Sequence, residues 1–423
     1  MTDALPAAVR PLFPALAREE DGRPAVFLDG PGGSQLPAAA IDAMAGLLRA
    51  GTANDGGVFA TTRETVALMA RARRAAAQLT GSAPEEIAFG ANMTTLSFLL
   101  AHAVARTLQP GDEVVVTDLD HDANVAPWLT VAADHDLVVR VAPITAEATL
   151  DADALEALLG ERTKVVAFTL ASNAVGSITD ARRIADAAHR VGALAWADAV
   201  HYAPHRRPDR GALGLDVLLC SPYKFFGPHL GLASIRRDMA ERWPADRVRP
   251  ASEDPPGHRF ETGTPSFEAL AGFVAAVDYL AGLGDGDLDA AYARIREHED
   301  ALSRHVLGRL SAVDGLTLHG IADPSLVAAR TPTFCFTLDA ATPRATTEHL
   351  ARRGIFAWDG NYYALALMEA LGLEDHGGAV RTGFLHYNTH EEADRLADAL
   401  EELAATGAPP TTAVTPRRDE APA

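Results

Sequence analysis

Short apolar segments alternate with stretches of helical spacing through the first half of the chain, and this alternation restricts the fold more than any other feature. The segments are four to seven residues long and rich in Val, Ala, Ile and Leu. Apolar strands that are separated by helices are typical of a mainly parallel sheet that helices cover on both faces. The sequence therefore predicts an α/β fold. The predicted strands are 86–89, 112–117, 137–142, 164–170, 193–197, 217–220 and 231–235.

The length of the chain predicts two domains, because 423 residues exceed what one hydrophobic core commonly organises. A second series of strands and helices follows a long amphipathic stretch at 288–313, which is long enough to link two domains. We predict an irregular N-terminal arm over 1–25, a large domain over 26–285 and a smaller α+β domain over 286–405. The tail 406–423 is rich in Ala, Pro and Thr, which predicts disorder.

Two capping boxes mark predicted helix starts. Thr61-x-x-Glu64 precedes a helix to about residue 79, and Thr389-x-x-Glu392 precedes the final helix. In the second half we also predict a helix near 362–371 and a strand at 379–387.

Charge and cysteine content exclude several classes of partner. A net charge of −20 argues against nucleic acid and anionic membranes as partners. No apolar run reaches the ~18 residues of a membrane span, and the start of the chain lacks a signal-peptide pattern. Two cysteines, Cys220 and Cys335, are too few for a disulfide framework. We therefore expect a cytoplasmic protein that acts on a small molecule.

Lysine is rare in this chain, since 35 of the 37 basic residues are arginine. The two lysines are Lys164, in an ordinary polar lead-in to a strand, and Lys224, between an apolar strand and a Phe-Phe-Gly-Pro turn. A lysine can lose its proton and form a Schiff base with a carbonyl, whereas a guanidinium cannot. Lys224 is therefore a candidate nucleophile, and the alternative is an ordinary surface lysine in a loop.

Polar residues follow the carboxyl ends of five predicted strands, where open α/β sheets bind ligands. They include a lysine, an aspartate, a histidine and a turn at a helix N-terminus, which together suit pyridoxal 5'-phosphate (PLP). Taken singly, each has an ordinary interpretation, such as a loop histidine, a helix cap or an Asx turn. Their order and location predict one pocket. The residues are Asn92, Met93, Thr94, Asp120, His121, Asn124, Ser172, Asn173, Asp198, His201, Ser221 and Lys224.

Several motifs within residues 25–400 resemble the class V aminotransferase family of fold-type I PLP enzymes, and within it the cysteine desulfurases. The resemblance implies a mainly parallel seven-stranded sheet in a large domain plus a smaller α+β C-terminal domain. The motifs are His-Asp-Ala-Asn-Val-Ala-Pro-Trp at 121–128, Ser-Asn-Ala-Val-Gly at 172–176, Asp-Ala-Val-His at 198–201, Ser-Pro-Tyr-Lys-Phe-Phe-Gly-Pro at 221–228, Glu-Thr-Gly-Thr-Pro at 261–265 and Val-Arg-Thr-Gly at 380–383.

The resemblance gives each cofactor residue a role. It implies that Lys224 forms the aldimine with PLP, that His121 stacks on the ring and that Asp198 pairs with the pyridine nitrogen. His201 then faces the phenolic oxygen, and Asn173 lies near the ring and the substrate.

The remaining contacts also come from the resemblance. It places Asn92, Met93, Thr94, Ser221 and Tyr223 around the cofactor. Thr264 binds the phosphate in the neighbouring subunit, which implies a homodimer with a shared active site. Arg381 binds the substrate α-carboxylate, a task that suits a bidentate guanidinium.

The chain departs from the desulfurase pattern at the residue that takes the sulfur. A desulfurase needs a mobile cysteine thiolate after a strand of the small domain, and the corresponding stretch 354–363 has none. Cys220 and Cys335 lie in apolar segments and are expected in the core. Asp359, Asn361, Tyr362 and Tyr363 occupy the region instead. We expect this loop to face the substrate side chain, and the alternative is that the two tyrosines pack a helix.

These observations favour a PLP-dependent lyase that acts on an α-amino acid, with β-elimination from a cysteine-type substrate and no persulfide relay. An aminotransferase, an amino-acid epimerase and a non-catalytic PLP-fold partner protein are the alternatives. A metal enzyme has little support, because no His-Glu-x-x-His motif occurs and Pro204 disfavours a helical pair of His201 and His205. The sequence leaves the substrate and the reaction type open.

Overall fold

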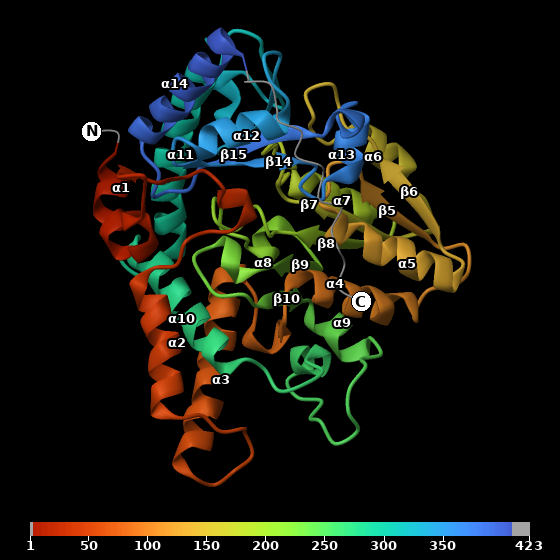
Figure 1. The fold of residues 1–423 in the computed structure, drawn as a ribbon. Helices are drawn as coiled ribbons and strands as arrows, with labels where there is room; N and C mark the ends of the chain where they lie inside the picture. The colour runs from red at the N-terminus through yellow and green to blue at the C-terminus, as the bar shows by residue number, and fades with distance from the viewer. Residues whose placement is uncertain (1–2, 408–423) are drawn as a thin grey trace, which may run out of the picture.

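The computed structural model describes residues 3–407, and a seven-stranded sheet forms its centre (Figure 1). The strand order is β4-β10-β9-β8-β7-β5-β6. β10 runs antiparallel to both of its neighbours, and the other pairs are parallel. The predicted mainly parallel sheet is therefore present. The strands are β4 Ile87–Gly90, β5 Glu113–Thr117, β6 Val138–Ala142, β7 Thr163–Thr169, β8 Leu194–Asp198, β9 Val217–Cys220 and β10 Gly231–Ile235.

Helices cover both faces of this sheet because successive strand residues point to opposite sides. In β5, for example, Val115 joins one core cluster while Val114 and Val116 join the other. The first face carries α3 Ala60–Thr80, α7 Ala181–Arg190 and α10 Phe267–Gly282. The second carries α4 Met93–Ala105, α5 Ala126–His135 and α9 Arg237–Arg242. The other helices of this part are α2 Ala38–Ala50, which packs on α10, α6 Ala152–Leu158 and α8 Arg210–Leu213.

A second, antiparallel sheet has the order β11-β12-β15-β14. The long helix α11, Leu288–Leu310, connects the two parts, since its first turns pack in the core of the large sheet and its last turns in that of the small one. The strands are β11 Leu316–His319, β12 Thr333–Leu338, β14 Trp358–Gly360 and β15 Ala379–Gly383. The helices are α12 Pro343–Ala351, α13 Leu365–Ala370 and α14 His390–Thr406.

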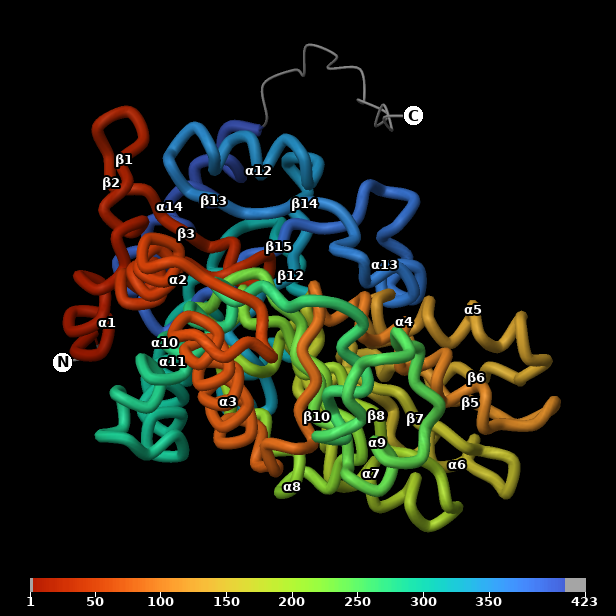
Figure 2. Tube along the Cα trace, turned by 90° about the horizontal axis from the view of Figure 1, so that it is seen from below, coloured from red at the N-terminus to blue at the C-terminus, as the bar shows by residue number. Residues whose placement is uncertain are grey.

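The N-terminal segment reaches the second part of the chain, where β3, Val26–Phe27, and β13, Ile355–Phe356, form a separate two-stranded parallel sheet (Figure 2). The segment expected to be irregular contains α1, Ala4–Val9, two 3-10 turns and the hairpin β1 Glu19–Glu20 with β2 Arg23–Pro24. This crossing carries the next loop, at 30–33, to the centre of the molecule.

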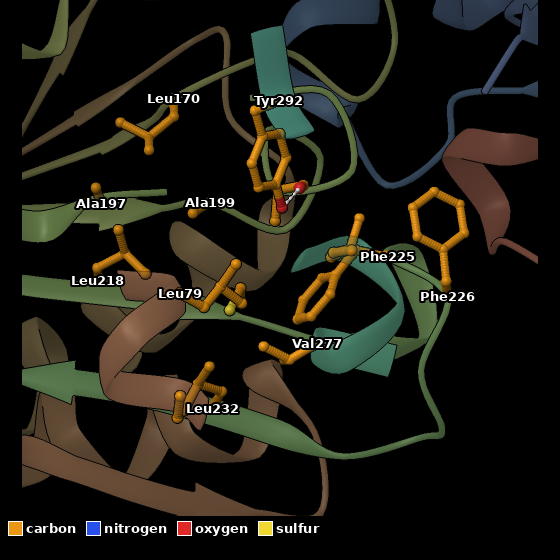
Figure 3. Close-up of a cluster of buried hydrophobic side chains, with 14 of the residues drawn as sticks. Leu79, Leu170, Ala197, Ala199, Leu218, Phe225, Phe226, Leu232, Val277 and Tyr292 are labelled. Carbon is orange, nitrogen blue, oxygen red and sulfur yellow. Dashed lines mark hydrogen bonds between the residues drawn. The ribbon is translucent and has the colours of Figure 1, made fainter. Parts of the chain in front are cut away.

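Two phenylalanines anchor the turn that contains Lys224. Phe225 and Phe226 are fully buried in the cluster between the large sheet and helices α10 and α11 (Figure 3). Burial of each ring contributes roughly 2–3 kcal/mol. Phe226 has a φ of 69°, a left-handed conformation that is costly for a bulky residue. The buried aromatic contacts therefore hold a strained turn directly behind the lysine.

Three local predictions were wrong. Helix α3 starts at Ala60 with Phe59 as N-cap, so Thr61 is not the cap. The chain leaves β15 at Gly383 rather than at 387, and α13 starts at Leu365 rather than at 362. The capping box of Thr389 and Glu392 is confirmed. The tail predicted to be disordered lies, beyond residue 407, outside the described residues, and no helix within 3–407 is long and apolar enough to cross a membrane.

Candidate active site

The predicted lysine lies at the carboxyl end of β9, in the 3-10 turn Pro222–Lys224. Its Nζ donates to the carbonyl oxygen of Pro31, in the loop that the N-terminal segment carries inward. Burial lowers the pKa of Lys224 to about 7, with a further contribution from the charge of Arg381, while Asp198 and Asp29 oppose the shift. A lysine with this pKa is neutral in a large part of the molecules near neutral pH, as a nucleophilic amine requires.

Asp198 ends β8 and is buried beneath the same cavity as Lys224. Its Oδ1 accepts a 2.7 Å hydrogen bond from the backbone N–H of Val200. Burial raises its pKa to about 6, against the lowering effect of this hydrogen bond and of Lys224. His201 is buried beside it, and its Nε2 lies 3.0 Å from Oγ1 of Thr333 in the small sheet. Both side chains line the inner cavity, as predicted from the strand ends.

The turn before α4 also borders this inner cavity. The N–H of Met93 donates to Oγ of Ser221 over 3.1 Å, and Thr94 lines the cavity with them. The side chain of Asn92 does not line it, because Oδ1 caps α4 by accepting from the N–H of Thr95 at 2.8 Å. A Cβ at Gly231 would lie 2.5 Å from the carbonyl oxygen of Asn92, so only glycine lets β10 approach this turn.

His121 lines both the inner and the outer cavity. Its Nδ1 accepts a 3.0 Å hydrogen bond from the N–H of Ala123, and its ring centroid lies 5.6 Å from that of Tyr363. Burial lowers its pKa to about 4, and the charges of Lys224 and Arg381 add to the effect. The imidazole is therefore neutral at physiological pH, as suits a ring that stacks on another ring.

Arg381 comes from β15 and is buried, with 5% of its surface exposed. Its Nη1 donates to the carbonyl oxygen of Asn173 over 2.9 Å, and its guanidinium lies 4.3 Å from the ring centre of Tyr362. Burial lowers the pKa of Arg381 to about 10, so it stays charged at neutral pH. Nε of Arg381 and Oδ1 of Asn173 are buried without a hydrogen-bond partner in the described structure. Two buried polar atoms thus remain available to a ligand.

The loop after β14 forms the outer wall of the site. Asp359 and Asn361 line the larger outer cavity, but both side chains already have partners. Oδ1 of Asp359 accepts from Oγ1 of Thr347 at 2.8 Å and its Oδ2 pairs with Arg344 at 3.1 Å, while Nδ2 of Asn361 donates to Oε1 of Glu374 at 3.0 Å.

The two remaining predicted residues, Tyr223 and Thr264, differ in whether they line the cavities. Tyr223 lines both cavities, with its ring stacked 4.8 Å from that of His229 and 4.9 Å from Nζ of Lys224. Thr264 is exposed and lines neither cavity of its own chain.

The sequence interpretation overlooked part of the site. Asp29 lies close enough to Lys224 and Arg381 for their charges to act on its carboxyl, and burial raises its pKa. Trp358 and Phe98 line the outer cavity. Asp29 lies two residues after the end of β3, so the rule applied to the other strand ends could have found it. No comparable signal marked Trp358.

Comparisons with known proteins identify the family. The aminotransferase class-V family profile matches residues 26–396. The chain belongs to this family. It is 31% identical over 411 residues to a cysteine desulfurase of Pectobacterium atrosepticum, covering 93% of this chain and 97% of that protein. A probable cysteine desulfurase of Halalkalibacterium halodurans is also 31% identical, over 409 residues, with coverage of 93% and 97%.

Solved structures agree. A cysteine desulfurase from Escherichia coli superimposes with a TM-score of 0.81 at 26% identity, covering 95% of this chain and 99% of that chain. One from Thermococcus onnurineus has the same fold, with a TM-score of 0.85 at 24% identity over 95% and 98% of the two chains. The protein is therefore a PLP-dependent enzyme of fold type I, similar to cysteine desulfurases.

The residues present fit the PLP that this family uses. The inner cavity is lined by the buried carboxylate of Asp198, by the N-terminus of α4 with Ser221, and by Lys224 and His121. A carboxylate suits the pyridine nitrogen and a helix N-terminus suits the phosphate. Asn173 lines both cavities and Arg381 lines the outer one, and each has a buried polar atom without a partner in the described residues. These donors suit PLP and an amino-acid carboxylate beside it.

Neither cysteine of this class V enzyme lies in the site. Cys220 and Cys335 are fully buried, and neither lines the inner or the outer cavity. Burial raises the pKa of Cys335 to about 12 and that of Cys220 further above its usual range. Both thiols are thus protonated at neutral pH and unsuited to nucleophilic attack.

Proposed function

We propose that this enzyme is a lyase that removes a β-substituent from a cysteine-type α-amino acid and passes no sulfur to a protein cysteine. The observation that carries the proposal is the pairing of a complete PLP-type site with two cysteines that are buried and protonated. β-Elimination releases its sulfur product directly, so it needs no thiolate on the protein.

Each residue then has a defined task. Arg381 binds the α-carboxylate through its free Nε, while Asn173 and Tyr362 hold the guanidinium in place. When the substrate has displaced Lys224 from the cofactor, the free amine takes the proton from Cα of the substrate. Its lowered pKa supports this role. PLP, when bound, supplies the electron sink for this step, and Asp198 holds a proton at the pyridine nitrogen. His201 lies next to Asp198 in the inner cavity, where it can donate to the phenolic oxygen.

The tertiary and quaternary organisation is part of the proposal. We propose that 26–285 and 286–405 are the two domains, and that the enzyme is a cytoplasmic homodimer. The exposed position of Thr264, away from the cavities of its own chain, supports a role in the partner's site. Light scattering of the purified protein would give the oligomeric state, and a Thr264→Ala variant with unchanged PLP affinity would contradict the shared site.

The test is a substrate panel with the purified holoenzyme. L-cysteine, cysteine sulfinate, cystine and common amino acids are incubated with the enzyme, and pyruvate, alanine, sulfide and keto acids are measured. We expect pyruvate with one or more of the cysteine-type compounds and none with Lys224→Ala. Alanine formation would indicate desulfuration, keto-acid exchange an aminotransferase, and loss of optical activity alone an epimerase. A wild type that never acquires the visible absorbance of lysine-bound PLP would contradict PLP-dependent catalysis altogether.

A further inference from the structure

The outer cavity is much larger than a cysteine needs. Its volume is about 1020 Å³. Lys224 and Arg381 both line it, and Lys224 lines the inner cavity as well. Ligand pockets of about 300–1,000 Å³ commonly enclose molecules of drug size. The cofactor residues Asp198, His201 and Ser221 line only the inner cavity. Lys224 and His121 line both cavities, so the cofactor takes part of the outer space and the rest remains for the substrate.

Aromatic rings form much of the outer wall. Trp358 and Tyr363 are 53% and 73% exposed, and both line this cavity together with Phe98. Trp358 lies against the loop of Gly32, where a Cβ would come within 2.9 Å of its Nε1. Exposed aromatic faces that converge on a cavity are typical of sites for apolar groups.

Backbone hydrogen bonds support part of this wall. Tyr362 and Tyr363 have φ angles of 59° and 57°, a left-handed conformation that needs external support. Two hydrogen bonds supply it: Nδ2 of Asn173 donates to the carbonyl oxygen of Tyr362 over 2.9 Å, and the N–H of Asp122 donates to that of Tyr363 over 2.7 Å. The backbone that carries Tyr363 is therefore fixed beside the cavity, which lowers the entropy cost of binding a large group there.

We propose that the outer cavity binds the bulky apolar S-substituent of a cysteine thioether, an inference that rests on the β-elimination proposed above. Arg381 fixes the carboxylate and Lys224 takes the Cα proton, which places the side chain toward Trp358 and Tyr363. The Cβ–S bond then breaks, both electrons go to sulfur, and the sulfur takes a proton and leaves as a free thiol. One water hydrolyses the three-carbon remainder to pyruvate and ammonia, so the step needs no oxidant or reductant.

The experiment compares S-benzyl-L-cysteine, S-methyl-L-cysteine and S-aminoethyl-L-cysteine as substrates of the holoenzyme, with pyruvate and thiol as readouts. We expect kcat/KM for the benzyl compound to exceed that for the methyl compound by at least about 10-fold, because one methylene-sized contact in an apolar pocket changes specificity by about that factor. Trp358→Ala and Tyr363→Ala should each reduce this ratio by about 10-fold.

Controls distinguish a failure of the proposed β-elimination from a failure of the proposed preference for a bulky S-substituent. Leu326→Ala removes an exposed apolar side chain outside the cavity and should leave the ratio unchanged, and Trp358→Phe keeps a ring and should retain the preference. Absence of pyruvate from every compound would contradict β-elimination itself. Pyruvate without a benzyl preference would overturn the inference alone, as expected if a segment of a second subunit fills the outer cavity. A preference for the aminoethyl compound would also overturn it, and would assign the specificity to the acidic side chains Asp122 and Glu374.

Discussion

The lowered pKa of Lys224 gives a prediction that can be measured at a single atom. Burial and the nearby charge of Arg381 bring this pKa from 10.5 to about 7. The difference corresponds to roughly 5 kcal/mol in favour of the neutral amine. At pH 7 about half of the Lys224 side chains are then neutral, compared with about one in 3,000 for an unperturbed lysine. In PLP-free protein, reaction of Lys224 with an amine-reactive label should therefore rise to a plateau with a midpoint near pH 7.

The chain provides its own reference for this assay, because Lys164 is the other lysine and lies at the surface, where its Nζ donates to the carbonyl oxygen of Glu161 over 2.7 Å. Pulse labelling at a series of pH values, digestion and mass spectrometry give the reactivity of both lysines in one sample.

The stability of the folded protein should also change with pH above about 7. Between pH 7 and 10.5 the unfolded chain binds a proton at Lys224 that the folded chain lacks, so this group makes the free energy of unfolding rise with pH.

Two variants should move the midpoint of Lys224 in opposite directions. Arg381→Gln removes a positive neighbour and should raise it, whereas Asp198→Asn removes a negative neighbour and should lower it. A wild-type midpoint near 10, or shifts of the same sign in both variants, would refute the electrostatic description of the site.

Three further predictions concern residues around the lysine. The double variant Cys220→Ala/Cys335→Ala should retain pyruvate formation, measured with the best substrate of the panel, because both thiols are buried away from the cavities; loss of turnover with an intact fold would restore a sulfur-relay mechanism. Arg381→Lys should lower kcat/KM by about 10- to 100-fold, mainly through KM, since it loses the planar guanidinium and its charge-assisted hydrogen bonds. Tyr362→Phe should cost about 1 kcal/mol of stability in denaturant unfolding, because the phenol O–H donates to the carbonyl oxygen of Ala379, and an unchanged midpoint would contradict this contribution.

Most strands of the large sheet could be predicted from the sequence. Buried parallel strands are continuous apolar runs, which can be identified without knowing which strands pair with them. Strands such as β9, Val217–Cys220, and β10, Gly231–Ile235, have the predicted bounds. The antiparallel direction of β10 was not predictable from its composition. A strand that is buried on both faces of a sheet has the same apolar residues whether it runs parallel or antiparallel to its neighbours. The wrong capping box at Thr61 has a physical reason: Oγ1 of Thr62 instead organises the preceding loop by accepting from the N–H of Gly57 and donating to the carbonyl oxygen of Asn54.

Site residues were predictable where one rule applied to each, namely a polar side chain that follows a strand end. Asp198, Ser221 and Lys224 satisfy it and line the inner cavity. The rule fails for Asn92, because an Asn at a helix start can cap the helix as readily as it can bind a ligand, and here it caps. The rule also does not show which polar side chains of a loop already have hydrogen-bond or ion-pair partners. Asp359 contacts Thr347 and Arg344, which lie 12 and 15 residues earlier in the chain, because α12 packs against β14.

Backbone strain near the site is concentrated at the residues that hold the two charged groups. Phe226 follows Lys224 by two residues, Tyr362 lies against Arg381, and both have φ angles in the left-handed region. Each such residue costs about 1–3 kcal/mol and persists only where its surroundings fix it. Buried rings fix Phe226, whereas Nδ2 of Asn173 fixes Tyr362 by donating to the carbonyl oxygen of Tyr362. The backbone carbonyl oxygen of Asn173 also accepts a hydrogen bond from Arg381. Asn173 thus couples the turn of Tyr362 to the guanidinium of Arg381. A perturbation of this turn should therefore act on carboxylate binding by Arg381 more strongly than on Asp198 and Ser221, which lie at strand ends of the large sheet.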